Sequence, residues 1–191
     1  MGKQCASIES NHREFILRQH IFFTASAAAR GHVNLSPKDG ASLRILGENR
    51  VAYLDLTGSG NETAAHLRAD GRLTLMFCAF EGAPTILRLY GRGKVLSRGS
   101  AEYRELLGAA FDHEESPGAR QMVLLEIDRV QTSCGYGVPL FDYAGERRTL
   151  KQWAEAKGGT GLEEYRLAKN AFSIDGLPTG IAETREADST Q

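Results

Sequence analysis

The feature that most constrains this sequence is a series of short stretches rich in β-branched and aromatic residues, with turn signals between them. The stretches predicted to be strands are residues 21–27, 32–35, 42–46, 50–56, 72–80, 85–97 and 121–132. Turns such as Arg30-Gly31, Asp39-Gly40 and Asp70-Gly71 separate them. Such short connections favour antiparallel pairing, so we predict a mainly β protein, either a barrel or a sandwich.

Helical patterns lie at the edges of this β-rich region. They cover residues 62–69, 101–111, 150–156 and 162–172, and a polar residue such as Ser10 or Asn11 can cap a further helix near the N-terminus. We therefore expect a single domain over residues 1–177, with an N-terminal helix at about 11–20, a barrel at about 21–132 and a C-terminal helical segment at about 133–177. Residues 178–191 are polar and are predicted to form a flexible tail.

The composition narrows the classes of function. Lys and Arg number 23 against 24 Asp and Glu, so the net charge of -1 provides no field for capturing nucleic acid or an anionic membrane surface. No apolar run could span a bilayer and the N-terminus is too polar for a secretory signal, so we expect a cytoplasmic protein. The three cysteines and five histidines form no ligand-spaced motif, and we expect no metal site.

The most informative segment for chemistry is the turn Thr57-Gly58-Ser59-Gly60-Asn61-Glu62-Thr63, between a predicted strand and a predicted short helix. A glycine-containing turn at a helix start presents unblocked main-chain N–H groups, which favour an anion such as phosphate. Asn61 and Thr63 would add side-chain donors. In the alternative interpretation, Ser59 and Glu62 form only a capping box and the glycines only a turn. The local pattern leaves both interpretations open.

Two further segments with cationic residues are weaker indications of an anion site. Lys38 follows the strand-ending proline of Asn34-Leu35-Ser36-Pro37 and could pair with an anion, or it is simply an exposed turn lysine. Four residues at alternate positions, Arg88, Tyr90, Arg92 and Lys94, would share one strand face. That face is a candidate anion surface, with a solvated outer face as the alternative.

Four segments together resemble the FMN-binding family related to pyridoxamine 5'-phosphate oxidase. They are VNLSPKDG at 33–40, YLDLTGSGNETAAHL at 53–67, LTLMFCAF at 73–80 and ILRLYGRGKVL at 86–96, and the resemblance spans roughly residues 22–137. It implies a six-stranded antiparallel Greek-key split barrel with peripheral helices. It also implies a homodimer that holds FMN between its subunits.

The resemblance further implies which residues contact the cofactor. The residues carried over are Ser36, Pro37, Lys38, Asp55, Leu56, Thr57, Gly58, Asn61, Thr63, Arg88 and Tyr136. The first three would line the flavin cleft, residues 55–57 would lie near the ribityl chain or ring, and Asn61 and Thr63 would hold the phosphate. Arg88 would be a further cofactor or interface contact, and Tyr136 an aromatic contact from the partner subunit.

One departure from the family pattern affects the expected activity. Where pyridoxamine 5'-phosphate oxidase itself typically has Ser-Arg-Lys, this chain has Asn61-Glu62-Thr63. We therefore expect an FMN-dependent oxidoreductase of unknown small-molecule substrate, with NAD(P)H as a candidate electron donor, and not a true pyridoxamine phosphate oxidase. Tyr136 and Asp55 are the candidates for proton transfer. The alternatives are a non-catalytic flavin-binding sensor, carrier or interaction module, and a split barrel that uses deazaflavin or haem.

Overall fold

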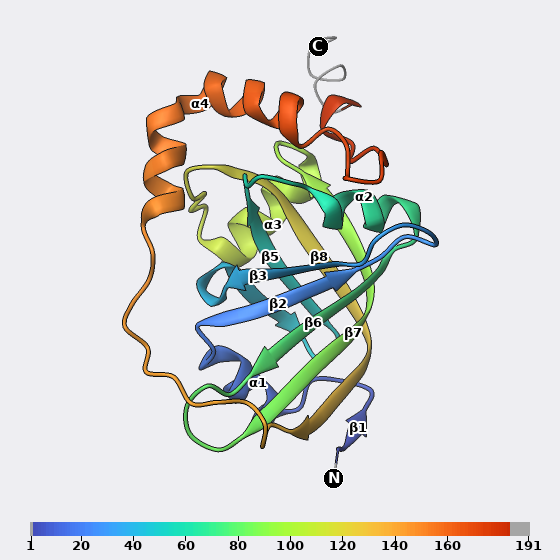
Figure 1. The fold of residues 1–191 in the computed structure, drawn as a ribbon, viewed down its shortest axis with the longest axis vertical. Coiled ribbons are helices and arrows are strands. Elements are labelled where there is room, and N and C mark those ends of the chain that lie inside the picture. Colours follow the sequence, from blue (N-terminus) through green and yellow to red (C-terminus); the bar gives the residue numbers. More distant parts are fainter. Residues whose placement is uncertain (1, 184–191) are drawn as a thin grey trace.

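The strands form one curled antiparallel sheet in the computed structural model, which describes residues 2–183 (Figure 1). They are β1 (Gln4–Cys5), β2 (Ile21–Ser26), β3 (Asn34–Asp39), β4 (Leu43–Gly47), β5 (Arg50–Leu56), β6 (Arg72–Cys78), β7 (Thr85–Ser97) and β8 (Ala119–Cys134). Their order across the sheet is β3-β2-β6-β7-β8-β5-β4, and the short β1 pairs with β8. The predicted mainly β, antiparallel class is confirmed, with seven strands on the main path instead of six.

The prediction for the second strand was wrong about Pro37. We expected this strand to end at the proline, yet β3 continues through it to Asp39, and Pro37 lies opposite Phe23. The reason is position, because β3 is the edge of the sheet and a residue without an N–H group is tolerated there.

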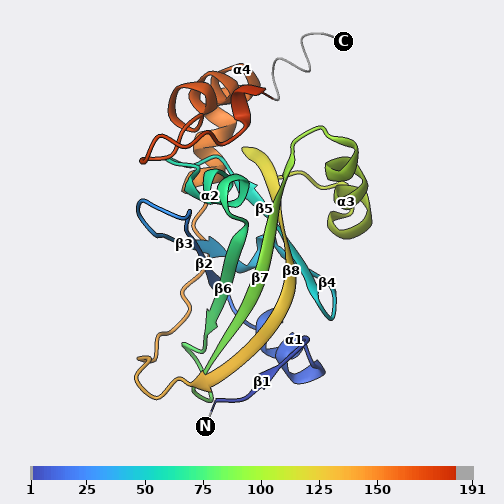
Figure 2. The ribbon, with the colours of Figure 1, turned by 90° about the vertical axis from the view of Figure 1, so that its right-hand side faces the viewer.

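The helices cover the ends and one side of the barrel. They are α1 (Ser10–Leu17), α2 (Glu62–Ala69), α3 (Ala101–Phe111) and α4 (Thr149–Lys169), together with the 3-10 turn Gly40–Ser42. Figures 1 and 2 show α1 at the lower end of the sheet and α2 at the upper end, with α4 above α2 and α3 beside the sheet. The two predicted C-terminal helices correspond to the two parts of α4, which are separated by a kink at Gly158, whose non-helical φ of 67° favours glycine.

The segment after α4 folds back onto the upper end of the molecule. Phe172 pairs with Pro178 in an isolated bridge, and the buried Thr179 hydroxyl donates a hydrogen bond to the carbonyl of Asn170. Of the residues expected to form a flexible tail, Pro178 and Thr179 therefore bond to the segment that follows α4, and Glu183 pairs with Arg68 of α2. Those at 184–191 lie outside the described residues.

Two apolar clusters stabilise the sheet. The larger fills the barrel interior and includes Phe22, Tyr53, Leu73, Leu75, Phe77, Leu87, Leu89, Val123 and Leu125. The smaller joins α3 to the opposite face of β5, β7 and β8 through Leu54, Leu96, Tyr103, Phe111 and Met122. Burying these side chains is the main driving force for this fold. In the part of the chain that the structure describes, no helix is both long and apolar enough to cross a membrane.

The long strand β7 depends on a glycine where it bends. The register between β7 and β8 shifts between Tyr90 and Gly91, which marks a β-bulge. A Cβ atom on Gly91 would lie 1.9 Å from the main-chain oxygen of Glu126. Backbone atoms cannot move away as a flexible side chain can, so only glycine fits at this position.

We expect Gly91→Ala to lower the free energy of unfolding by about 2–3 kcal/mol, since the added methyl group overpacks the β7–β8 contact. Urea denaturation of the purified variant measures this change. The matched control is Gly47→Ala, because a Cβ at Gly47 would meet no atom within 4 Å. Its effect should stay within about 0.5 kcal/mol. Equal stabilities for the two variants would contradict the proposed close approach.

Candidate functional site

The candidate site is built on the bend that joins β5 to α2. Thr57 follows β5, and both its main-chain N–H and its hydroxyl donate to the carbonyl of Gly118, each at 2.8 Å. The carbonyl of Gly58 accepts from Asn170 Nδ2 at 3.1 Å, and the carbonyl of Gly60 accepts from Arg120 Nη1 at 2.9 Å. Side chains of β8 and of the C-terminal end of α4 therefore bind these two carbonyl groups of the bend.

The main-chain N–H groups of the same bend after Thr57, unlike these carbonyl groups, are not hydrogen-bonded by the described part of the chain. Within residues 2–183, no main-chain N–H from Gly58 to Ala64 donates a hydrogen bond. Asn61 is the N-cap of α2, yet its side chain makes no capping bond, so the predicted alternative of a simple Ser59–Glu62 capping box is not formed. A Cβ at Gly58 would meet nothing within 4 Å, which leaves space beside these donors. Such an arrangement favours an anion.

Asn61 adds a second donor at the same place. Its side chain is 2% exposed, and its Oδ1 accepts a hydrogen bond from Gln121 Nε2 at 2.8 Å. Its Nδ2 has no partner among the described residues. A buried polar atom without a partner is costly, so this amide is suited to a ligand that accepts its hydrogen bond.

A buried ionic cluster lies directly behind the bend. The carboxylate of Asp55 accepts from Lys38 Nζ at 2.6 Å and from Arg120 Nη2 at 2.7 Å. Gln121 Nε2 also donates to Asp55, at 2.9 Å, and so links the carboxylate to Asn61. Lys38 comes from β3, Asp55 from β5 and Arg120 from β8, so the cluster joins three strands that are separated in the sequence.

The charges in this cluster favour an ionised Asp55. Burial opposes ionisation, but the positive charges of Arg120 and Lys38 outweigh it and lower the pKa of the Asp55 carboxyl far below its usual value. A carboxylate held in this way by two cations is a weak proton acceptor at neutral pH. Asp55 is thus better placed to anchor the site than to transfer a proton.

The polar side chains of β3 and the first turn of α2 extend the site. Thr63 Oγ1 accepts from Asn34 Nδ2 at 3.2 Å, and Asn34 Oδ1 in turn accepts from the Ser36 hydroxyl at 3.2 Å. The carboxylate of Glu62 accepts the Ile174 main-chain N–H at 3.1 Å. Its negative charge lies near Gly60 and opposes an anion at the bend.

The structure separates the predicted cofactor-binding residues into groups. Those that come together near the bend are Ser36, Lys38, Asp55, Thr57, Gly58, Asn61 and Thr63. Leu56 packs on the other side of β5, in the cluster under α3. Pro37 and Arg88 lie in one row across β3, β2, β6 and β7, in line with Phe23 and Met76, on the outer face of the sheet.

Besides Leu56 and Pro37, the predicted residues Arg88 and Tyr136 do not join the group at the bend in the single chain. Arg88 donates to the Ser133 hydroxyl at 2.9 Å, and Tyr136 is 83% exposed in the turn after β8. Whether they reach a cofactor through a partner subunit stays a prediction.

Four polar residues that hydrogen-bond to the bend or to Asp55 were not predicted from the sequence. They are Arg120, Gln121, Arg166 and Asn170. Arg120 and Gln121 directly precede the apolar run Met122–Leu125 of β8, and charged residues beside such a run are rarely buried unless they are paired. That signal could have identified the first two. Arg166 and Asn170 come from α4, and no local pattern predicts that this helix contacts the bend.

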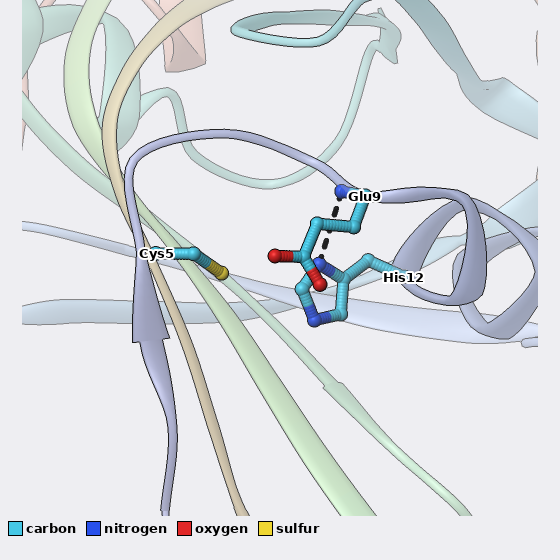
Figure 3. A group of neighbouring side chains, drawn as sticks. All are labelled: Cys5, Glu9 and His12. Atoms are coloured by element: carbon cyan, nitrogen blue, oxygen red, sulfur yellow. Dashed lines mark hydrogen bonds between the residues drawn. The ribbon is translucent and has the colours of Figure 1, made fainter.

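Three side chains with metal-binding atoms gather at the opposite end of the molecule, where no site was predicted (Figure 3). One ligand atom each from Cys5, Glu9 and His12 lie within 4.8 Å of one another. Two of these groups already have partners: the Glu9 main-chain N–H donates to His12 Nδ1 at 3.1 Å, and Lys3 Nζ lies 3.1 Å from the Glu9 carboxylate. The arrangement is a helix capping box with a nearby thiol, and the absence of a metal site remains an expectation.

Comparison with known proteins identifies the family. The pyridoxamine 5'-phosphate oxidase family profile matches residues 8–134. The pyridoxamine 5'-phosphate oxidase family protein ustO of Aspergillus flavus is 40% identical over 188 residues, which cover 90% of this chain and 75% of that protein. This chain belongs to the pyridoxamine 5'-phosphate oxidase family.

One solved structure shares this fold over two thirds of the chain. A HupZ variant from Group A Streptococcus matches with a TM-score of 0.51 and 18% identity, over 66% of this chain and 99% of that one. An FAD-binding protein from Mesorhizobium loti matches with a TM-score of 0.48 and 11% identity, over 69% of this chain and 96% of that one.

We expect Asp55→Asn to lower the free energy of unfolding at pH 7 by about 3–5 kcal/mol, because it leaves Lys38 and Arg120 without their shared counter-charge. Since the native pKa of Asp55 is lowered, its carboxylate stabilises the fold above the unfolded-state pKa of about 3.9. That contribution is lost as the pH falls further. The difference between wild type and variant should therefore shrink below about pH 4.

Denaturation curves between neutral and acidic pH measure both effects. The control is Asp128→Asn, which changes an exposed carboxylate on β8 and should alter stability by less than about 0.5 kcal/mol. A stability difference for Asp55→Asn that does not change with pH would show that the carboxylate charge is not what stabilises the cluster.

Proposed function

We propose that this protein binds FMN and is a flavin-dependent oxidoreductase, with the FMN phosphate at the bend between β5 and α2. One observation carries the proposal: the consecutive N–H groups from Gly58 to Ala64 and the Nδ2 of the buried Asn61 have no partner among the described residues. Donors that converge at a helix N-terminus are the usual protein solution for holding a phosphate. Family membership supports the same assignment.

The residues at the bend fit a phosphate, with one adverse charge. Lys38 and Arg120 carry two positive charges against the single negative charge of Asp55, so the cluster behind the bend has a positive balance. The Glu62 carboxylate beside Gly60 offsets part of it. Arg120 and Arg166 are engaged by the Gly60 carbonyl and the Thr57 hydroxyl, so we expect no bidentate arginine contact to the phosphate and a retention of FMN that is sensitive to salt.

The flavin would supply the electron or hydride transfer, and the protein would bind and orient it. Asp55 holds Lys38 and Arg120 in place and, as an ionised group, keeps the site polar without itself exchanging a proton. Tyr136 remains the candidate for a proton donor if the partner subunit brings it to the flavin. A small-molecule substrate and NAD(P)H as the electron donor complete the proposal.

We further propose that the active form is a homodimer that uses the outer face of β2, β3, β6 and β7. This face carries Phe23, Leu35, Pro37, Met76 and Arg88, and it is turned toward the viewer in Figure 1 with no helix in front of it. Leu35 is 63% exposed there. An uncovered sheet face with apolar side chains is typical of a protein interface, and a partner on this face would bring a second Arg88 to the boundary between the subunits.

We expect wild-type protein to bind FMN at least about tenfold more tightly than riboflavin, which lacks the phosphate, and Asn61→Asp to remove most of that preference. The substitution keeps the acceptor for Gln121, removes the unpaired donor and adds a negative charge where the phosphate would lie. Fluorescence titration of both flavins measures the ratio of affinities. The control Gln4→Glu adds the same charge in β1, at the other end of the molecule, and should leave the ratio unchanged.

Reduction kinetics test whether the bound flavin turns over. We expect NADPH or NADH to bleach the flavin absorbance under anaerobic conditions, followed by reoxidation when oxygen is admitted. A flavin that binds tightly but is reduced by neither nucleotide would favour a sensor or carrier instead of an oxidoreductase. Tight binding of haem or a deazaflavin in place of FMN would contradict the cofactor assignment.

We expect Leu35→Asp to shift the protein from dimer to monomer, because a charge in the centre of an apolar interface is left without a partner. Sedimentation velocity at micromolar concentration measures the change. Leu140 is 75% exposed in the loop before α4, so Leu140→Asp is the matched control and should stay dimeric. A wild-type protein that sediments as a monomer would refute the interface.

A further inference from the structure

A second feature of the structure is a pocket beside α2. Its volume is about 560 Å³, and α2, β7, the start of β8, α4 and residues 179–181 enclose it. These elements meet at the upper end of the molecule in Figure 2. Volumes of this size are usual for sites that bind small molecules. None of residues 57–63 lines the pocket, so it is separate from the proposed phosphate site.

The lining of the pocket is strongly cationic. Its charged residues are Arg68, Lys94, Arg98, Arg120, Arg166 and Glu163. Most of the cations have a carboxylate partner: Arg98 pairs with Glu115 at 2.5 Å and Arg120 with Asp55 at 2.7 Å, and Arg68 and Lys94 have exposed partners. Arg166 is the exception among residues 2–183, because it forms no ion pair.

Arg166 is held rigidly but only by neutral groups. Its Nε donates to the Thr57 hydroxyl at 2.8 Å and its Nη2 to the Ala119 carbonyl at 2.8 Å, while its Nη1 has no acceptor among the described residues. Burial and the charges of Arg98 and Arg120 lower the pKa of the Arg166 guanidinium. The Glu163 and Glu115 carboxylates offset these effects only in part, so an anion beside this half-buried cation would be favourable.

The lining also has an apolar part. Leu67, Val95, Leu167 and Ile181 supply it, and the lining further includes the uncharged polar residues Ser97, Gln121 and Thr179. An inorganic anion alone would leave these apolar side chains in contact with water. A molecule that joins one anionic group to an apolar body would satisfy both parts of the pocket.

We propose that this pocket is a second ligand site, which binds a small organic anion independently of the flavin. The carboxylate or phosphate group of the ligand accepts hydrogen bonds from Arg166 and lies close to Arg98. The apolar part of the ligand packs against Leu67, Val95 and Leu167.

Calorimetric titration of flavin-free protein tests the proposal with four probes: benzoate, phenyl phosphate, benzyl alcohol and inorganic phosphate. We expect benzoate or phenyl phosphate to bind at least about fivefold more tightly than both benzyl alcohol and inorganic phosphate. Tighter binding of benzoate would indicate a carboxylate site, and tighter binding of phenyl phosphate would indicate a phosphate site. Absence of binding by both at about 10 mM would overturn the proposal.

Two variants locate the binding. Arg166→Gln should weaken the preferred anion by about tenfold or more, while Arg50→Gln, which changes an exposed arginine paired with Glu126, should have no effect. Circular dichroism establishes whether each variant is folded. A folded Arg166→Gln that binds the anion as tightly as wild type would place the ligand elsewhere and refute the site.

A measurement on wild-type protein covers the case in which Arg166→Gln does not fold. Arginine labelling with p-hydroxyphenylglyoxal, followed by peptide mass spectrometry, should show that phenyl phosphate protects Arg166 and leaves Arg50 unprotected. Equal labelling of Arg166 with and without the anion would contradict the proposal. Since no flavin is present, failure here leaves the FMN proposal intact, and failure of FMN binding leaves this one intact.

Discussion

The buried carboxylate of Asp55 is the interaction on which the rest of this structure depends. A charge in the interior is tolerated only when opposite charges and hydrogen bonds compensate it, and here Lys38 and Arg120 provide them from two other strands. Arg120 then extends the connection, because it also donates to the carbonyl of Gly60 and to the side chain of Asn170 at the end of α4. One ionic cluster thereby fixes the open end of the barrel, the bend and the C-terminal helix relative to each other.

In this arrangement, the carbonyl groups and the N–H groups of the bend differ in their hydrogen bonding. Its carbonyl groups are bound by Arg120 and Asn170, whereas its N–H groups remain available. Because the carbonyls are fixed, the donors hold their direction without a ligand, and less ordering is needed when an anion binds. The cationic pocket beside α2 is lined in part by α4. The proposed cofactor site and the proposed anion site are therefore neighbours that share three supports, Arg120, Gln121 and Arg166.

The strands and the shorter helices could be predicted because their signals are local. The alternating pattern of residues 85–97 and the turn signals around Asp70-Gly71 depend only on nearby residues, and β7 and α2 form where they were expected. The course of β3 through Pro37 was missed, because it depends on which strand lies at the edge of the sheet.

The site was predictable only in part, because much of it depends on contacts between distant parts of the chain. Local composition identifies the bend as a candidate, but the support from Arg166 and Asn170 comes from a helix about a hundred positions later in the chain. The pairing of Lys38 with Asp55 likewise depends on two hairpins that meet in space. The sequence suggested Lys38 as a partner for a ligand anion, and the structure gives it a carboxylate of the protein instead.

The central claim is that the unpaired donors of the bend hold the phosphate of FMN, and the most direct measurement is the phosphorus NMR spectrum of FMN titrated with this protein. The account predicts a saturable change in the phosphate resonance at an equivalence of one FMN per chain, with exchange that slows as salt is lowered. A phosphate resonance that stays at its free-solution position while excess protein is added would contradict it.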